Sequence, residues 1–264
     1  MIKKSYAKLN LTLKIVGKKN GFHLLESVVC PIDLYDILKF EISEKDEIVS
    51  NIQIENNNIF KAISLFKGYT KIKKSVKVTL EKNIPIGYGL GSSSTNISTT
   101  FIALNELFET NLSDDILEYL VNKLGSDTVF SLYNKRSFLS GKGEQIITSN
   151  PSKKFKFLIV LPDQKLLTKD VFKVYKNTSK YYSFKEHLLD NLYLKNNAQN
   201  DLLNSAILLN NEVKNIIKKG NDLNIKFNLT GSGSALFIID PSSKEVELIK
   251  KEFKRYKIIE TKEL

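Results

Sequence analysis

A turn-rich segment at residues 85–96 carries the clearest chemical signal in the sequence. It reads Pro-Ile-Gly-Tyr-Gly-Leu-Gly-Ser-Ser-Ser-Thr-Asn and runs into apolar residues at helical spacing. Glycines lack Cβ atoms and let backbone N–H groups approach an anion, and the positive end of the following helix favours a phosphate there. The segment therefore predicts a phosphate-binding loop, although a serine-rich helix cap is an equal alternative when it is taken alone. It matches neither the Walker sequence nor the dinucleotide fingerprint.

Lys8 and Asn10 form a second candidate group. Polar and apolar residues alternate between residues 6 and 15, which predicts a half-buried strand. Lys8 and Asn10 then project from the same polar side, one two-residue repeat apart. Taken alone, Lys8 fits a solvated strand lysine better than a catalytic one.

Asp127 and His23 are the remaining candidate catalytic or binding residues. Asp127 follows a helix that we expect to begin after Ser113, and it reads in isolation as a helix cap or a surface acid. His23 follows Gly21 and Phe22, and a lone histidine is usually a surface or core residue. Neither residue establishes a site without its neighbours.

The elements that must position these residues are mixed. Strands are expected near residues 26–32, 37–42, 76–80, 155–161, 226–229 and 235–239, and helices near residues 58–66, 97–108, 168–175 and 245–253. Asn58 is the expected cap of the first helix, and Gly220 is the expected end of a helical stretch that reaches Lys219. Because there is no regular βαβ rhythm, the order predicts an α+β protein in two layers with mostly antiparallel sheets. The polar segment 150–154 is the best linker, which gives two domains, 1–150 and 151–264.

Composition limits the classes of protein. With 264 residues, 42% hydrophobic and 26% charged, the chain is an ordinary globular protein and neither fibrous nor disordered. We expect a cytoplasmic protein because no apolar run approaches the roughly 20 residues of a spanning helix and polar residues interrupt any signal-peptide core. One cysteine and two histidines exclude an intrachain disulfide and a four-ligand Cys/His zinc site. Any metal must be held by oxygen, which favours magnesium.

The net charge of +11 would attract any polyanion. The lysines are scattered rather than gathered on one element, so a solvated lysine-rich surface is a better interpretation than a nucleic-acid face. We therefore expect a small-molecule substrate, no nucleic-acid or membrane partner, and a monomer or weak homodimer.

Three separated motifs occur in the order found in GHMP kinases, which the chain resembles over nearly its whole length. Residues 85–93 match the central Pro-x-x-x-Gly-Leu-Gly-Ser-Ser loop, residues 230–235 match the glycine-rich turn near the C-terminus, and residues 7–11 match the Ala-Lys-Leu-Asn strand. The resemblance implies the two-domain GHMP kinase fold, with an N-terminal ribosomal protein S5 domain 2-like part and a C-terminal α/β sandwich. It also implies phosphoryl transfer from ATP, with Mg²⁺, to an alcohol.

The resemblance also implies roles for individual residues. Asp127 would accept the proton of the substrate hydroxyl, while Lys8 would orient that carboxylate and offset charge on the transferred phosphate. The residues expected at ATP are Pro85, Gly87, Gly89, Leu90, Gly91, Ser92, Ser93, Ser94, Thr95 and Asn96. The metal ligands stay open, since Asp127 is the one obvious acid, and Ser94 and Asn96 are further candidates.

Within the family, the likeness is strongest to kinases whose alcohol carries a cytidine diphosphate. Gly-Phe-His-Leu-Leu at residues 21–25 and Leu-Gly-Ser-Asp at residues 124–127 carry this likeness. It implies that Phe22 stacks on the pyrimidine and that His23 hydrogen-bonds the base. The residues expected at the substrate are Asn10, Phe22, His23, Thr168, Phe172, Gly231, Ser232 and Gly233; Thr168 and Phe172 fit a helix cap and a core aromatic equally well.

Two alternatives remain at this point. Ser92 and Ser93 stand where this branch usually has glycine, which brings the loop nearer to the general family pattern. A mevalonate-type or homoserine-type kinase is therefore the first alternative. The second, prompted by the net charge, is a catalytically silent or nucleic-acid-binding module on the same fold.

Overall fold

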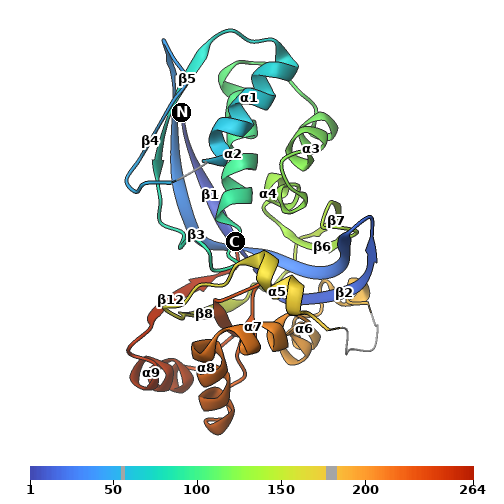
Figure 1. Cartoon of the computed structure of the whole chain (residues 1–264), viewed down its shortest axis with the longest axis vertical. Helices are drawn as coiled ribbons and strands as arrows, with labels where there is room; N and C mark the ends of the chain where they lie inside the picture. The colour runs from blue at the N-terminus through green and yellow to red at the C-terminus, as the bar shows by residue number, and fades with distance from the viewer. Residues whose placement is uncertain (55–56, 177–182) are drawn as a thin grey trace. The chain divides into compact units, whose positions relative to one another are not determined.

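The chain forms two compact units of strands and helices in a computed structural model that describes residues 1–54, 57–176 and 183–264 (Figure 1). The first unit comprises Met1–Ala7, Leu34–Pro85 and Gly91–Asn134, and the second comprises Lys8–Asp33, Ile86–Leu90 and Lys135–Leu264. Strands β1 (Ile2–Asn10) and β3 (Phe22–Ser43) therefore contribute residues to both. Residue 150, the expected domain boundary, falls inside the second unit; the division at that residue stays a prediction.

The first unit is a sheet accompanied by helices. Its further elements are β4 (Glu47–Ser50), α1 (Asn58–Thr70), β5 (Ser75–Glu81), α2 (Ser92–Leu107), α3 (Asp114–Asn122), η1 (Ser126–Thr128) and α4 (Phe130–Tyr133). β3 pairs with β5 in antiparallel register from Ile37 opposite Glu81 to Ser43 opposite Ser75, and β4 adds to β5 in parallel. Helices α1 and α2 lie side by side (Figure 1). Phe66 of α1 and Phe101 of α2 meet in this core, with ring centroids 5.8 Å apart.

The second unit contains a four-stranded antiparallel sheet in the order β10-β11-β8-β12. Its elements are β2 (Thr12–Lys19), β6 (Arg136–Ser140), β7 (Gln145–Ser149), β8 (Lys156–Leu161), α5 (Thr168–Val174), η2 (Lys185–His187), α6 (Asn191–Asn197), β9 (Gln199–Asn200), α7 (Leu203–Leu209), α8 (Asn211–Asp222), β10 (Asn228–Leu229), β11 (Leu236–Ile239), α9 (Ser243–Glu252) and β12 (Lys257–Lys262). One apolar core joins β8 and β11 to α5, α7, α8 and α9. The predicted α+β class with mostly antiparallel strands is confirmed; β4 with β5 and β2 with β9 are parallel.

Three local predictions are wrong. The expected strand 6–15 is two strands broken at Leu11, and its polar side is buried rather than solvated, with Lys14 only 1% exposed. The cap of α1 is Asn57, whose Oδ1 accepts from Ile59 N at 3.1 Å, not Asn58. Gly220 lies within α8 instead of ending it. A Cβ there would come within 2.6 Å of the Phe227 ring, so close packing explains this glycine.

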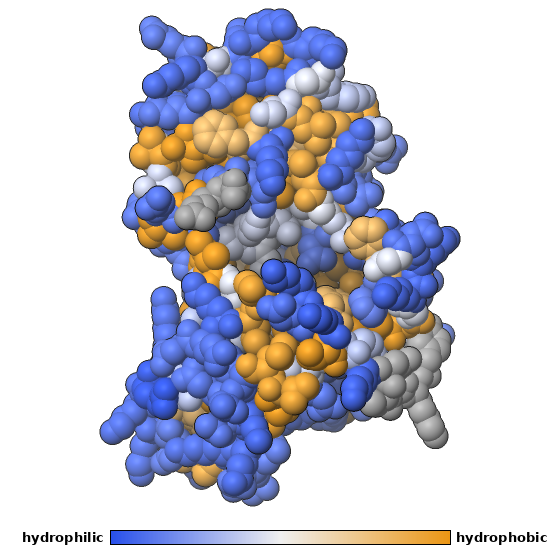
Figure 2. All heavy atoms as spheres, viewed as in Figure 1, coloured by the Kyte–Doolittle hydropathy of each residue, from blue (hydrophilic) through white to orange (hydrophobic). Residues whose placement is uncertain are grey.

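Hydrophilic side chains dominate the surface over α8 and α9, at the lower left of Figure 2. Exposed lysines there alternate with acids: Lys219 pairs with Glu252 at 2.7 Å and Lys250 pairs with Glu260. In the part of the chain that the structure describes, no helix combines the length and apolar character needed to cross a bilayer.

Candidate active site

Lys8 and Asn10 lie together in the second unit, both 7% exposed. The Lys8 ammonium donates a hydrogen bond to Asn10 Oδ1, while Asn10 Nδ2 donates to Ser27 Oγ at 2.9 Å. The Asn10 backbone N–H donates to Thr230 Oγ1 at 3.0 Å. Both side chains lie on one side of β1, as the alternation predicted. The Lys8 ammonium is therefore a buried positive charge beside the glycine-rich turn at residues 230–234.

The first half of the glycine loop belongs to the same group. Lys8 N donates to Leu90 O at 3.0 Å, so the loop runs along β1. A Cβ on Gly89 would lie 2.4 Å from the Thr230 carbonyl oxygen, and one on Gly231 would lie 3.1 Å from Gly89 O and 3.4 Å from Lys8 Nζ. Both glycines have positive φ, +78° and +56°. Glycine is required here because two backbones and a lysine head share one small volume.

Asn200 anchors the glycine-rich turn through hydrogen bonds to its backbone. Its Nδ2 donates to Leu229 O at 2.9 Å and Gly231 O at 2.8 Å, and it is 7% exposed. Thr168 Oγ1, at the start of α5, lies 2.8 Å from Ser232 Oγ. The structure thereby joins Thr168 to the turn. Asn200 was missed by the sequence analysis because its partners are backbone carbonyls about 30 residues away.

His23 and Phe172 form an aromatic pair in the second unit. Their ring centroids lie 5.0 Å apart at 27°, and Tyr175 meets His23 edge-on at 5.9 Å. Phe22, 59% exposed, instead lies under Lys142 Nζ, 4.9 Å from the ring centroid. Consecutive residues of a strand face opposite sides, which explains why Phe22 and His23 have different neighbours. Burial and, after it, the nearby Lys18 charge lower the pKa of His23, which favours the neutral imidazole.

The second half of the loop begins α2 in the first unit. Gly91 is the N-cap with a φ of +79°, and the hydroxyl of Ser93 accepts from Asn58 Nδ2 at 2.7 Å. Thr95 Oγ1 accepts from Ser5 Oγ at 3.0 Å. The first turn of α2 thus has its N–H groups free of a side-chain cap, as an anion-binding helix end requires.

Asp127 lies in the same unit, in the short helix η1, and is exposed. The hydroxyl of Ser98, on α2, donates to Thr128 O at 2.6 Å, and Thr128 Oγ1 donates to Val121 O at 2.8 Å. These contacts fix η1 against α2 and α3. Asp127 is therefore held in a short helix that is hydrogen-bonded to its neighbours, and the residue is exposed to solvent.

The predicted residues thus fall into two sets, each described within its own unit. The first unit holds Pro85, Gly91, Ser92, Ser93, Ser94, Thr95, Asn96 and Asp127; the second holds Lys8, Asn10, Phe22, His23, Gly87, Gly89, Leu90, Thr168, Phe172, Gly231, Ser232 and Gly233.

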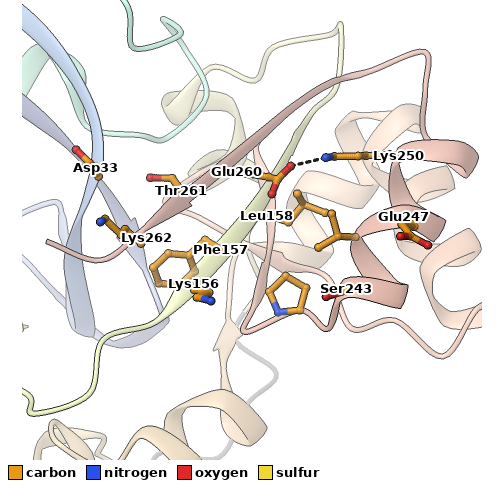
Figure 3. Close-up of a pocket in the computed structure, with 12 residues that line it drawn as sticks. Asp33, Lys156, Phe157, Leu158, Ser243, Glu247, Lys250, Glu260, Thr261 and Lys262 are labelled. Carbon is orange, nitrogen blue, oxygen red and sulfur yellow. Dashed lines mark ion pairs between the residues drawn. The ribbon is translucent and has the colours of Figure 1, made fainter.

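A separate hollow of about 630 Å³ lies on β8, β12 and α9 (Figure 3). Its walls carry both positively charged lysines and negatively charged acids, including the Lys250–Glu260 ion pair. None of the predicted site residues lines it. We do not assign it to the reaction.

Comparison with known proteins identifies the family. Residues 57–135 match the GHMP kinases N terminal domain. A 4-diphosphocytidyl-2-C-methyl-D-erythritol kinase from Thermodesulfovibrio yellowstonii is 32% identical over 96% of this chain and 94% of its own length. The chain belongs to the 4-diphosphocytidyl-2-C-methyl-D-erythritol kinase family. A Chlamydia muridarum member of this family is also 32% identical, over 91% of this chain and 85% of its own length.

Solved structures agree on the fold of this kinase family. A crystal structure of 4-(cytidine 5'-diphospho)-2C-methyl-D-erythritol kinase superposes with a TM-score of 0.83, at 22% identity, over 99% of this chain and 98% of that one. The predicted GHMP kinase fold is therefore confirmed.

Proposed function

We propose that the chain transfers the γ-phosphoryl group of ATP to the 2-hydroxyl of 4-diphosphocytidyl-2-C-methyl-D-erythritol, a step of the non-mevalonate route to isoprenoid precursors. The observation that carries this proposal is the likeness to kinases of that name over nearly the full length of both chains. The buried Lys8–Asn10 pair beside two glycine turns supports it from the structure.

Asp127 is the proposed general base and Lys8 its electrostatic partner. The substrate hydroxyl gives its proton to the Asp127 carboxylate, and the alcohol oxygen forms a bond to the γ-phosphorus of ATP while the bond from that phosphorus to the β–γ bridging oxygen breaks and ADP leaves. Lys8 offsets the charge that develops on the phosphoryl oxygens. Because Asn10 holds its ammonium, this charge is oriented before substrate binds.

The cytidine is proposed to bind beside β3 and α5. A neutral His23 has one nitrogen that donates and one that accepts, which suits a base edge that carries both kinds of group. Phe172 and Tyr175 already pack on the His23 ring, so the imidazole is held in place. Phe22 has an exposed ring but faces away from His23, so its proposed stacking on the pyrimidine rests on the family likeness alone.

ATP is proposed to lie on the glycine loop with Mg²⁺. Its phosphates would meet the bare N–H groups of Gly87, Gly89 and Gly91 and of the first turn of α2. The candidate ligands are oxygen donors, which suits magnesium: the exposed Asp127 carboxylate, and the Ser94 hydroxyl or the Asn96 amide oxygen, with the triphosphate itself. The described residues contain no group of three or more His, Cys, Asp or Glu that could hold a metal. When bound, Mg²⁺ would neutralise phosphate charge.

A substrate panel tests the proposal. ADP release is measured with ATP and, separately, 4-diphosphocytidyl-2-C-methyl-D-erythritol, mevalonate and homoserine. We expect turnover with the cytidine diphosphate alcohol alone. Turnover with mevalonate or homoserine alone would instead assign the chain to the alternative small-molecule kinases, and the roles of Phe22 and His23 would fail. Salt-sensitive oligonucleotide binding without any ADP release would favour the silent binding module.

Asp127→Asn tests the base separately. It should lower kcat by roughly 10²–10⁴-fold while leaving ATP affinity almost unchanged, because the amide cannot accept the proton but keeps an oxygen that can still ligate Mg²⁺. Near wild-type turnover in this variant removes Asp127 from the mechanism. We also propose a cytoplasmic monomer or weak homodimer without nucleic-acid or membrane partners; light scattering after size exclusion measures the association state.

A further inference from the structure

A fully buried carboxylate, Asp36, lies in the first unit outside the set of residues that the sequence singled out. Its Oδ1 accepts the backbone N–H groups of Asn83 and Ile84, both at 2.8 Å. Its Oδ2 accepts from Ser92 Oγ at 2.9 Å and from Asn96 Nδ2 at 3.1 Å. The Lys82 ammonium lies 3.1 Å from each oxygen.

These partners lie at the two ends of the glycine loop. Asn83 and Ile84 immediately precede Pro85, where the loop begins, while Ser92 and Asn96 form the first turn of α2, where it ends. One oxygen thus holds the entry and the other holds the exit. Both ends belong to the first unit, so one side chain sets the span that the loop must cross.

The charge of Asp36 is compensated on the spot. A carboxylate removed from water is costly unless it is paired and hydrogen-bonded, and the Lys82 side chain that pairs with it is only 4% exposed. Burial lowers the pKa of Lys82, and the Asp36 carboxylate opposes that effect. Both carboxylate oxygens therefore accept hydrogen bonds from the protein, and neither is exposed to water.

Asp36 also decides how Asn96 is oriented. With Nδ2 on the carboxylate, the Asn96 amide directs Oδ1 elsewhere, and a reversed amide would place two oxygens against each other. That Oδ1 is buried and has no hydrogen-bond partner among the described residues. The loop end therefore keeps an unused acceptor at the start of α2, where the proposed nucleotide phosphates and their cation would arrive.

From this geometry we infer that Asp36 is a positioning residue, which fixes both ends of the glycine loop and so arranges its N–H groups for the triphosphate before ATP binds. The inference rests on the proposed use of ATP. Its physical basis is preorganisation: an ordered loop loses less conformational freedom when the ligand binds.

Asp36→Asn separates positioning from folding. The Oδ1 that remains still accepts the N–H groups of Asn83 and Ile84, which supports the backbone. The new Nδ2 faces Ser92 and Asn96, where an acceptor was, so both loop-side groups must rotate. We expect the Kd of a non-hydrolysable ATP analogue and the KM for ATP to rise about tenfold or more, with KM for the alcohol changed less than twofold.

Asp46→Asn is the matched control. Asp46 also joins two segments of the first unit, accepting from Lys67 Nζ at 2.6 Å and Val76 N at 3.0 Å, but it does not touch the loop. It should lower stability without raising the Kd of the analogue. Hydrogen exchange at residues 91–96 should accelerate in Asp36→Asn only. Ser92→Ala, which deletes one loop-side donor, is the milder variant if Asp36→Asn does not fold, and it should raise the same Kd at least threefold.

The outcomes are decisive in each case. An unchanged Kd in a folded Asp36→Asn, or in Ser92→Ala when it replaces that variant, overturns the inference, as does an equal rise in Asp46→Asn. If the wild type binds the analogue but releases no ADP, the proposed function fails, while the binding comparison still decides the role of Asp36. If the wild type binds no nucleotide, both fail.

Discussion

Gly89 offers the sharpest steric test of the site. Its φ is +78°, and a Cβ would come within 2.4 Å of Thr230 O, more than half an ångström inside the 3.0 Å that real Cβ atoms respect. Gly87 has a similar φ of +86°, but the atoms nearest to its Cβ would belong to the Lys165 side chain, with Cδ at 3.2 Å and no backbone atom among them. Alanine at either position costs about 1–2 kcal/mol for the left-handed backbone. Alanine at Gly89 must also push two backbones apart.

The expected results differ accordingly. Gly87→Ala should lower the free energy of unfolding by about 1–2 kcal/mol and kcat/KM by less than tenfold. Gly89→Ala should cost a further ~1–3 kcal/mol, as overpacking does, and should reduce kcat/KM by about 10–100-fold more, because misplacement of about 1 Å can cost 10²-fold. Urea unfolding and coupled ADP release measure the two quantities. Equal kcat/KM in both variants would refute the argued contact between the loop and Thr230.

The remaining predictions concern one buried ion pair and one titrating group. Glu263→Gln should lower the free energy of unfolding by about 3–5 kcal/mol, because it leaves Arg136 buried without its counter-charge. Glu260→Gln, which breaks an exposed ion pair, should lower it by under ~1 kcal/mol. Similar urea midpoints for the two variants would contradict this prediction. Because the folded pKa of His23 lies below 6.5, the unfolded chain takes up this proton first as pH falls. The stability that His23 supports is therefore complete above about pH 6.5 and is lost as the pH falls toward the lowered pKa. Urea titrations between about pH 7.5 and 5.5 should show a steeper loss of stability in the wild type than in His23→Gln. Parallel curves for the two proteins would contradict this pH dependence.

Local patterns predicted the elements and the residues that act through their own backbone. Alternation placed Lys8 and Asn10 on the same side of β1, and the glycine loop did run into a helix. The same alternation failed on burial: Thr12 is 0% exposed and Lys14 1%. Thr12 accepts from Val28 N, and Lys14 lies 3.7 Å from Asp201. These partners come from distant parts of the chain, which periodicity does not contain.

Asp36 shows what sequence reasoning missed at the site itself. A single acid within the largely apolar segment 34–38 has no local spacing that marks it, and its partners lie 46 to 60 residues away. Gly220 was misread for a related reason, because a glycine required by tertiary packing looks like a helix terminator. In both cases the deciding contact is non-local. The contiguous motif at residues 85–93 was recoverable because the glycines and the helix start that define it are neighbours in the sequence; its use for ATP stays a proposal.

Phosphorus NMR of the reaction products is the most direct test of the reaction that we assign to this chain. After incubation with ATP, Mg²⁺ and 4-diphosphocytidyl-2-C-methyl-D-erythritol, the spectrum should show one new phosphomonoester coupled to the 2-position of the alcohol, formed in equal amount with ADP. An unchanged cytidine diphosphate alcohol, or a phosphate carried at another oxygen, would contradict the assignment.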